Sequence, residues 1–163
     1  MRRYLILITV LFLTILSSAQ VGKFEFKGTI DDDSTNLGIS GVTVTLYEEA
    51  KGIFIESVIT GSNGNYKFKG VSADKNYIVK ISKTGYVSKF FLIIGENIQV
   101  ANTANFPIEM SSSMFKGNAD DFYLLEHIPV AIGRYSKSVD NIEWDINYIE
   151  SIKKMMDKIK NKK

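Results

Sequence analysis

The chain has 163 residues and contains no cysteine and a single histidine, His127. The missing cysteines exclude disulfide bonds, thiolate metal sites and a cysteine nucleophile. Arg2 and Arg3 account for the formal net charge of +2, because the remaining 18 basic residues equal the 18 acidic ones, so nucleic acid is not indicated as a partner.

The first 19 residues have the pattern of an export signal. A positive start, residues 1–3, is followed by an apolar run of 13 residues, Tyr4 to Leu16, and by the small residues 17–19. We therefore predict that residues 1–19 are a signal peptide cleaved after Ala19. An uncleaved anchor is the alternative, but the run is shorter than the roughly 20 apolar residues that span a bilayer. The predicted location is the periplasm or cell surface of a Gram-negative bacterium, or the medium, with no transmembrane span after cleavage.

Residues 20–110 alternate apolar and polar side chains in short runs that end at turn-forming residues, which predicts antiparallel β-strands. The first strand covers residues 21–30 and turns Phe24, Phe26 and Ile30 inward. Residues 31–40 are rich in turn formers and are predicted to be a loop. A calcium site at its three aspartates is an alternative to a solvated turn, although the ordered spacing of a dedicated calcium loop is missing.

The strands that follow show the same alternation of apolar and polar residues. Residues 61–65, Gly-Ser-Asn-Gly-Asn, predict a hairpin turn that joins a strand at 53–60 to one at 66–69. Residues 87–94 are apolar on both faces and predict a central strand. The last strand, 102–110, contains Pro107, which has no amide donor and therefore belongs at an edge or a bulge. We expect a seven-stranded antiparallel β-sandwich that forms one domain.

Five short segments carry a family resemblance. They are Lys27–Ile30, Leu37–Val44, Gly64–Phe68, Tyr77–Lys80 and Gly85-Tyr86. In this order and spacing they resemble the carboxypeptidase regulatory-like domain, a transthyretin-like (prealbumin-like) β-sandwich. The resemblance implies an accessory, non-catalytic module of the kind that occurs in many exported bacterial envelope proteins.

Residues 111–163 are predicted to form a C-terminal appendage. Three serines provide a linker, residues 128–135 are expected to pair with 141–144, and a lysine-rich amphipathic helix is expected from a cap at Asp145 to about residue 160. The apolar face of this helix either packs on the sandwich or remains exposed as a stripe for a partner.

No residue of the chain is assigned a catalytic, cofactor-binding or metal-binding role. A Ser-His-Asp arrangement would need His127, and no nucleophile-elbow sequence is present. One histidine without cysteines also excludes the paired-histidine zinc motifs.

The sequence therefore favours a non-enzymatic exported module of the cell envelope for protein or glycan contact or for structural spacing. The alternative is a small-ligand carrier or hydrolase with a pocket between the sandwich and the C-terminal tail, in which His127 would meet a serine and a carboxylate. A helper of a membrane complex that docks through the lysine-rich helix is a third hypothesis. Ligand, partner and oligomeric state stay open.

Overall fold

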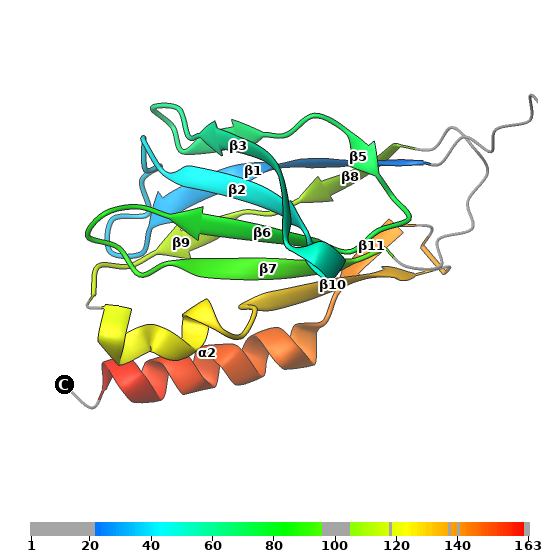
Figure 1. Cartoon of the computed structure of the whole chain (residues 1–163). Helices are drawn as coiled ribbons and strands as arrows, with labels where there is room; N and C mark the ends of the chain where they lie inside the picture. Colours follow the sequence, from blue (N-terminus) through cyan, green and yellow to red (C-terminus); the bar gives the residue numbers. More distant parts are fainter. Residues whose placement is uncertain (1–21, 96–104, 118, 137, 140, 162–163) are drawn as a thin grey trace, which may run out of the picture.

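The computed structural model describes residues 22–95, 105–117, 119–136, 138–139 and 141–161. Within them the chain forms two packed β-sheets and a C-terminal helix (Figure 1). The predicted signal peptide, residues 1–19, lies outside the described residues, as do residues 102–104 of the predicted last strand.

The first sheet has five strands and is centred on β1 (Lys23–Asp32). β4 (Asn65–Lys67) and β5 (Val71–Ser72) pair with β1 antiparallel. β8 (Asn105–Glu109) and β9 (Ser112–Met114) pair with it in parallel. Among the described residues β8 pairs with β1 alone, so Pro107 lies on an edge strand, as its missing amide donor predicts.

The second sheet has six strands in the order β11-β10-β7-β6-β2-β3. Their bounds, in that order, are Asn141–Trp144, Ala131–Ser136, Lys89–Ile94, Tyr77–Ser82, Thr43–Glu48 and Ile53–Ile59. The chain also contains two 3-10 segments, η1 (Glu49–Lys51) and η2 (Ala119–Glu126), and the helix α2 (Ile146–Lys160).

The sandwich with its hairpin and helix appendage is the fold that the sequence predicts. The strand number is larger than the expected seven, because β10 and β11 extend the second sheet and short strands line both sides of β1. β10 joins β7 in parallel, so the appendage continues the sheet of the sandwich instead of standing apart from it.

The core consists of the inward-facing residues of both sheets. Phe24 and Phe26 of β1 are fully buried, and their rings contact Tyr77 at 6.1 and 5.9 Å between centroids in edge-on geometry. The hydroxyl of Tyr66 donates to the carbonyl of Met110 at 2.7 Å, and burial raises the pKa of this phenol.

The turn at residues 61–64 is present, but the predicted hairpin is wrong. The amide of Gly64 donates to the carbonyl of Gly61 at 3.0 Å, and Gly64 has a φ of 73°. The strands on either side belong to different sheets, since β3 pairs with β2 and β4 pairs with β1. The turn therefore carries the chain across the sandwich, and its Asn-Gly chemistry serves this crossing as well as it would serve a hairpin.

The aspartate-rich loop is held by its own side chains. β1 extends to Asp32, two residues beyond the predicted strand end. The carboxylate of Asp32 accepts hydrogen bonds from the hydroxyl of Ser34, from the hydroxyl of Tyr86 at 2.8 Å and from the backbone amide of Ser34 at 2.9 Å. These bonds hold the pKa of Asp32 well below its usual range.

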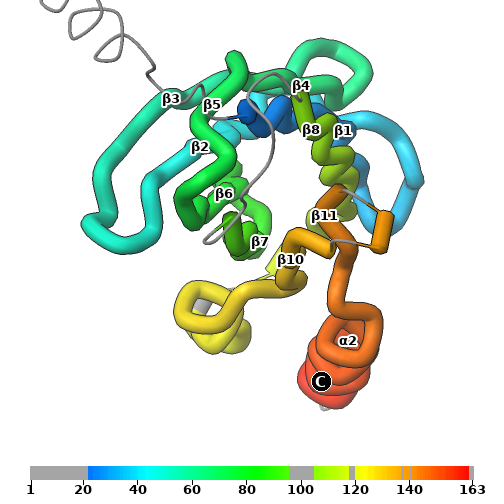
Figure 2. The backbone as a smooth tube through the Cα atoms, turned by 90° about the vertical axis from the view of Figure 1, so that its right-hand side faces the viewer, coloured from blue at the N-terminus to red at the C-terminus, as the bar shows by residue number. Residues whose placement is uncertain are grey.

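The helix α2 packs on the sandwich. Of the two predicted arrangements, the packed apolar face is therefore present and the exposed stripe is not. Asp145 caps it by accepting from the amide of Tyr148 at 3.0 Å. Ile152 is 5% exposed, and the Tyr148 hydroxyl donates to the carbonyl of Pro129 at 2.8 Å. At the far end Lys160 forms an ion pair of 2.9 Å with Asp33. Both η2 and α2 lie on the same side of the sandwich, beyond β7 and β10 (Figures 1 and 2).

We expect Gly64→Ala to destabilise the protein much more than Gly52→Ala, although both glycines have a positive φ. A Cβ at Gly64 would lie 2.3 Å from the carbonyl oxygen of Ile30, whereas nothing lies within 4 Å of a Cβ at Gly52. The conformational cost alone is about 1–2 kcal/mol, and the backbone clash at Gly64 adds to it. Urea unfolding followed by circular dichroism measures the difference. Equal losses in the two variants would show that β1 and the turn do not approach closely.

We expect Ile152→Ala to lower the free energy of unfolding by about 2–4 kcal/mol, because it opens a cavity under α2. Ile146→Ala, on the same helix at a position that is 60% exposed, is the matched control and should change it by less than about 0.5 kcal/mol. A helix that does not pack on the sandwich in solution would make the two substitutions equally mild. The measurement is again urea unfolding.

Candidate functional site

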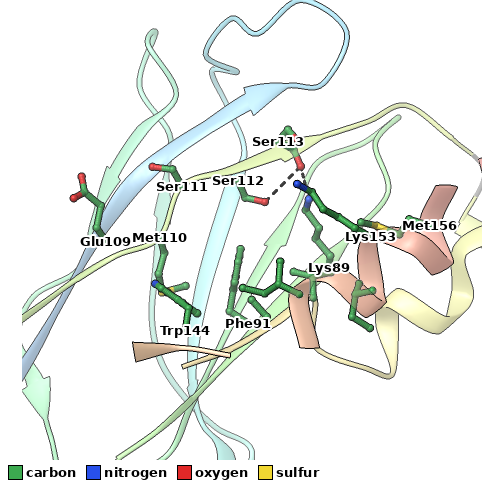
Figure 3. A pocket seen from close by; sticks show the side chains of 14 residues that line it. Lys89, Phe91, Glu109, Met110, Ser111, Ser112, Ser113, Trp144, Lys153 and Met156 are labelled. Atoms are coloured by element: carbon green, nitrogen blue, oxygen red, sulfur yellow. Dashed lines mark hydrogen bonds between the residues drawn. The ribbon is translucent and has the colours of Figure 1, made fainter. Parts of the chain in front are cut away.

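A cavity of about 320 Å³ lies where α2 crosses the edge of the sandwich (Figure 3). Three parts of the chain enclose it. The second sheet contributes side chains of β7, β10 and β11, the segment Glu109–Ser113 contributes the end of β8 and the start of β9, and α2 contributes one face.

The position of the cavity follows from how the two sheets end. β10 and β11 continue the second sheet past β7, while the first sheet ends at β8 and β9. The helix bridges the resulting gap with Ile149, Ile152, Lys153 and Met156, which are spaced three and four residues apart and so lie on one face. The cavity is thus bounded by strands on two sides and by this helix face on the third.

Most of the lining is apolar. Phe91 and Trp144 meet edge-on with ring centroids 6.1 Å apart. Met110, Val130 and Ala131 add further apolar surface from the two strand walls. Such a lining with a few polar groups is typical of sites for small molecules.

Lys89 is the charged group inside this lining. It is 5% exposed, and its ammonium donates a hydrogen bond to the backbone carbonyl of Ser113. Burial lowers the pKa of Lys89 to about 8, because water no longer solvates the charged form. The amine is therefore mostly protonated at neutral pH but loses its proton within a mildly basic range.

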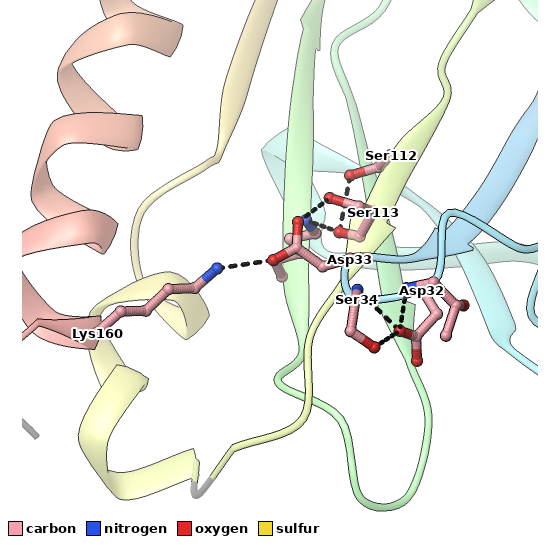
Figure 4. Close-up of polar contacts among 8 residues, drawn as sticks. Asp32, Asp33, Ser34, Ser112, Ser113 and Lys160 are labelled. Carbon is pink, nitrogen blue, oxygen red and sulfur yellow. Dashed lines mark hydrogen bonds and ion pairs between the residues drawn. The ribbon is translucent and has the colours of Figure 1, made fainter.

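A second polar cluster shares Ser113 with Lys89, and Figure 4 shows its members Asp33, Ser113 and Lys160. Asp33 accepts a hydrogen bond from the Ser113 hydroxyl at 3.1 Å and pairs with Lys160 at 2.9 Å. The hydrogen bond from Lys160 is the main reason that the pKa of Asp33 is lowered. Lys160 also lies over the ring of Phe115, 4.2 Å from its centroid, so this cluster fastens the end of α2 to the sandwich.

Lys89 was not among the residues predicted from the sequence to form a site. A signal for it was present, since Lys89 alternates with the inward-facing residues Val87, Phe91 and Ile93. A lysine in phase with buried residues is unusual, because lysine side chains are rarely fully buried without a partner. The predicted central strand was right, but both of its faces were treated as uniformly apolar.

His127 takes no part in the cavity. It is exposed at the end of η2, where its ring lies 5.8 Å from that of Tyr123. Within the residues that the structure describes, no group of three or more His, Asp or Glu side chains is placed to hold a metal ion. Of the three aspartates at residues 31–33, Asp32 accepts hydrogen bonds within the loop and Asp33 pairs with Lys160. No helix in the described part of the chain is long and apolar enough to cross a membrane.

Several solved structures are similar to this chain over part of their length. A 3-chlorocatechol 1,2-dioxygenase from Rhodococcus opacus 1CP has 10% identity and a TM-score of 0.41, with 62% of each chain covered. The Bacillus anthracis TIE protein has 22% identity and a TM-score of 0.44, over 58% of this chain and 17% of that one. The group B streptococcus pilus 2b backbone protein has 14% identity and a TM-score of 0.39, over 58% and 41%. The chain spans less than two thirds of the length of each of these three proteins.

No curated protein matches the chain. The model of the carboxypeptidase regulatory-like domain matches residues 25–111, from β1 to the end of β8 and just beyond. The match covers more than half of the chain and coincides with the sandwich, without the β10–β11 hairpin and α2. On this basis the chain belongs to the carboxypeptidase regulatory-like domain family.

Proposed function

We propose that the protein is a non-enzymatic exported module of the bacterial cell envelope that contacts another protein through the free edge of β3. The observation that carries the proposal is this edge. β3 is the last strand of the six-stranded sheet, so one row of its backbone amides and carbonyls faces away from the sheet. Figure 1 shows it on the outside of the sandwich, opposite α2.

The side chains of β3 are unusually apolar for an exposed strand. Ile53, Phe54 and Ile59 are 47%, 58% and 72% exposed. Exposed apolar edges are the surfaces to which an extended segment of another protein adds as a further strand, with backbone hydrogen bonds for affinity and side-chain contacts for specificity. The occupant that we propose is therefore an extended protein segment with apolar residues at alternating positions.

A bulge defines where such a segment would pair. The register between β2 and β3 shifts at Ile55, between the partners Tyr47↔Phe54 and Leu46↔Glu56. Bulges protect edge strands against uncontrolled pairing because they twist the edge. The regular part that remains, Glu56–Ile59, is short, which suits a specific contact better than an extended sheet between many copies.

Two observations support a non-enzymatic role. The family domain is an accessory module and not the catalytic part of the carboxypeptidases. In this chain the lone histidine, His127, is exposed and lies outside the cavity. A hydrolase that uses His127 with a serine and a carboxylate therefore has no support in the arrangement of these residues.

One observation favours the alternative function of a small-ligand carrier. This observation is the cavity between the sandwich and the C-terminal segment. Its lining combines apolar side chains with the buried amine of Lys89. A carrier function and protein contact through β3 do not exclude each other, because the cavity and β3 lie at opposite edges of the second sheet.

We expect a photo-crosslinking amino acid at Phe54 or Ile59 to capture a distinct envelope protein in the cells that produce this chain. Benzoylphenylalanine resembles the side chain at Phe54 and leaves the backbone of β3 unchanged. Adducts are detected by gel shift and identified by mass spectrometry. The same group at Tyr123, which is 57% exposed on η2, is the matched control and should give no such adduct. Absence of an adduct from β3, or the same adduct from Tyr123, would contradict the proposal.

We expect the mature protein to begin at Gln20 and to be recovered from the envelope or the medium. N-terminal sequencing and intact mass of the protein isolated from fractionated cells measure both points. Ala19→Arg should retain the first 19 residues, since the cleavage site needs a small residue. Recovery of the full-length chain from the cytoplasm would refute export.

A further inference from the structure

Lys89 is placed where a lysine is costly. A buried ammonium is normally paired with an anion, because the loss of solvation otherwise destabilises the folded state. In the part of the chain that the structure describes, no carboxylate oxygen lies within 4 Å of this ammonium, and its acceptor is the carbonyl of Ser113. An ammonium has three donors, and this bond uses one of them.

Both basic and acidic groups surround Lys89, and none of the carboxylates among the described residues pairs with it directly. Lys153 of α2 lines the same cavity, and in Figure 3 its side chain extends toward the end where Lys89 lies. Asp33, the acidic group whose charge acts on Lys89, is already bonded to Lys160. Glu109 also lines the cavity, but Figure 3 shows it at the other end, beyond Met110.

The rest of the cavity offers apolar surface. Phe91 and Trp144 lie between the Lys89 end and Glu109 in Figure 3, and Met156 lies beside Lys153. Ser112 contributes a hydroxyl near the amine, and its hydrogen bond to the Ser113 carbonyl is long, 3.5 Å, so the hydroxyl is available to another acceptor. A cationic end and an apolar body thus lie next to each other in one space.

We propose that this cavity binds a small amphipathic carboxylate, with the carboxylate against Lys89 and Lys153 and the apolar chain against Phe91, Trp144 and the facing side of α2. The anion supplies the partner that the buried ammonium lacks, which is the charge complementarity that selects it over a neutral molecule. The volume of about 320 Å³ fits a single short chain and not a double-chain lipid. This site is independent of the β3 edge.

The chain carries its own reporter for this proposal. Trp144 lines the cavity and is the single tryptophan of the sequence, so its fluorescence responds to an occupant without a label. We expect decanoate, below the concentration at which it forms micelles, to change this fluorescence in a saturable way. Decanol, of equal chain length and without charge, should bind about tenfold more weakly or less, and acetate should not bind.

Lys89→Met keeps the length of the side chain and removes the charge. We expect it to weaken decanoate binding by about tenfold or more, in line with the loss of a charge-assisted hydrogen bond, and to remove the preference for decanoate over decanol. Lys153→Met should weaken binding by a smaller factor. Lys158→Met, on the same helix and away from the lining, is the matched control and should bind as the original chain does.

Two further measurements separate binding from folding. The melting temperature of Lys89→Met should not fall, because the cost of burying the charge is removed with the lysine. Ile149→Phe adds bulk at a half-buried lining position while Lys89 and the single tryptophan are retained, and it should also weaken decanoate binding. The second variant keeps the test decisive if Lys89→Met does not fold.

Proton uptake provides a signature that a structural lysine would not give. A bound carboxylate favours the charged amine and raises the pKa of Lys89, so the protein should take up protons on binding near pH 8.5. Affinity should fall from pH 7 to pH 10 as the amine is deprotonated. The charges of Asp33 and Lys160 also act on Lys89, and Glu109 and Lys153 line the same cavity. Calorimetry in buffers of different ionisation enthalpy measures the uptake.

Three results would contradict the proposed binding of a carboxylate by Lys89. Decanoate that leaves Trp144 fluorescence unchanged, or that binds Lys89→Met as tightly as the original chain, would show that the amine does not select an anion. Equal binding of decanol and decanoate by the original chain would have the same meaning.

Discussion

The structure depends on the central position of β1. Its inward residues Phe24, Phe26 and Ile30 are fully buried, and its backbone pairs with β4 and β5 as well as with β8 and β9. One strand near the start of the folded part therefore binds segments from the middle of the chain and from beyond residue 105. The contact is close enough that a Cβ at Gly28 would lie 2.1 Å from the carbonyl oxygen of Met110. Glycine at this position allows β8 to pass into β9 along β1 without a break in the core.

The local features of the fold were predictable because they depend on neighbouring residues. Two-residue alternation predicts which side chains face the core, and Asp145 with the spacing that follows predicts α2. Pairing partners were not predictable in the same way. The turn at Gly61–Gly64 has the chemistry of a hairpin, but the sheet that receives the next strand is decided by contacts with Ile30 and Gly38, which lie far away in sequence. The parallel pairing of β8 with β1 and of β10 with β7 likewise has no local signal.

The sequence indicated a pocket between the sandwich and the C-terminal tail only as an alternative, and its lining was not predicted. The pattern of α2 predicts an apolar face at Ile149, Ile152 and Met156, but it does not say which surface this face covers or whether space remains beneath it. That space exists because the first sheet ends at β9 while the second continues through β10 and β11. Lys89 could have been recognised from the sequence because it alternates with inward-facing residues of its strand. A lysine in an inward position is nevertheless consistent with both a satisfied core group and a binding site. Only the position of Ser113 and the lack of a carboxylate within ion-pair distance among the described residues distinguish the two.

The two edges of the six-stranded sheet differ in how far the chain itself covers them. This difference argues that the two edges have different functions. A free edge strand invites pairing with other chains, so natural proteins cover, shorten or bend such edges. At one edge the chain adds β10 and β11 and places α2 over the gap, which leaves the side chain of Lys89 in the lining of a small pocket. At the other edge β3 has a bulge at Ile55 and still exposes Phe54 and Ile59. The chain thus covers one edge with its own C-terminal segment and leaves the other accessible, and an edge that is left accessible with apolar side chains costs solubility unless a partner covers it.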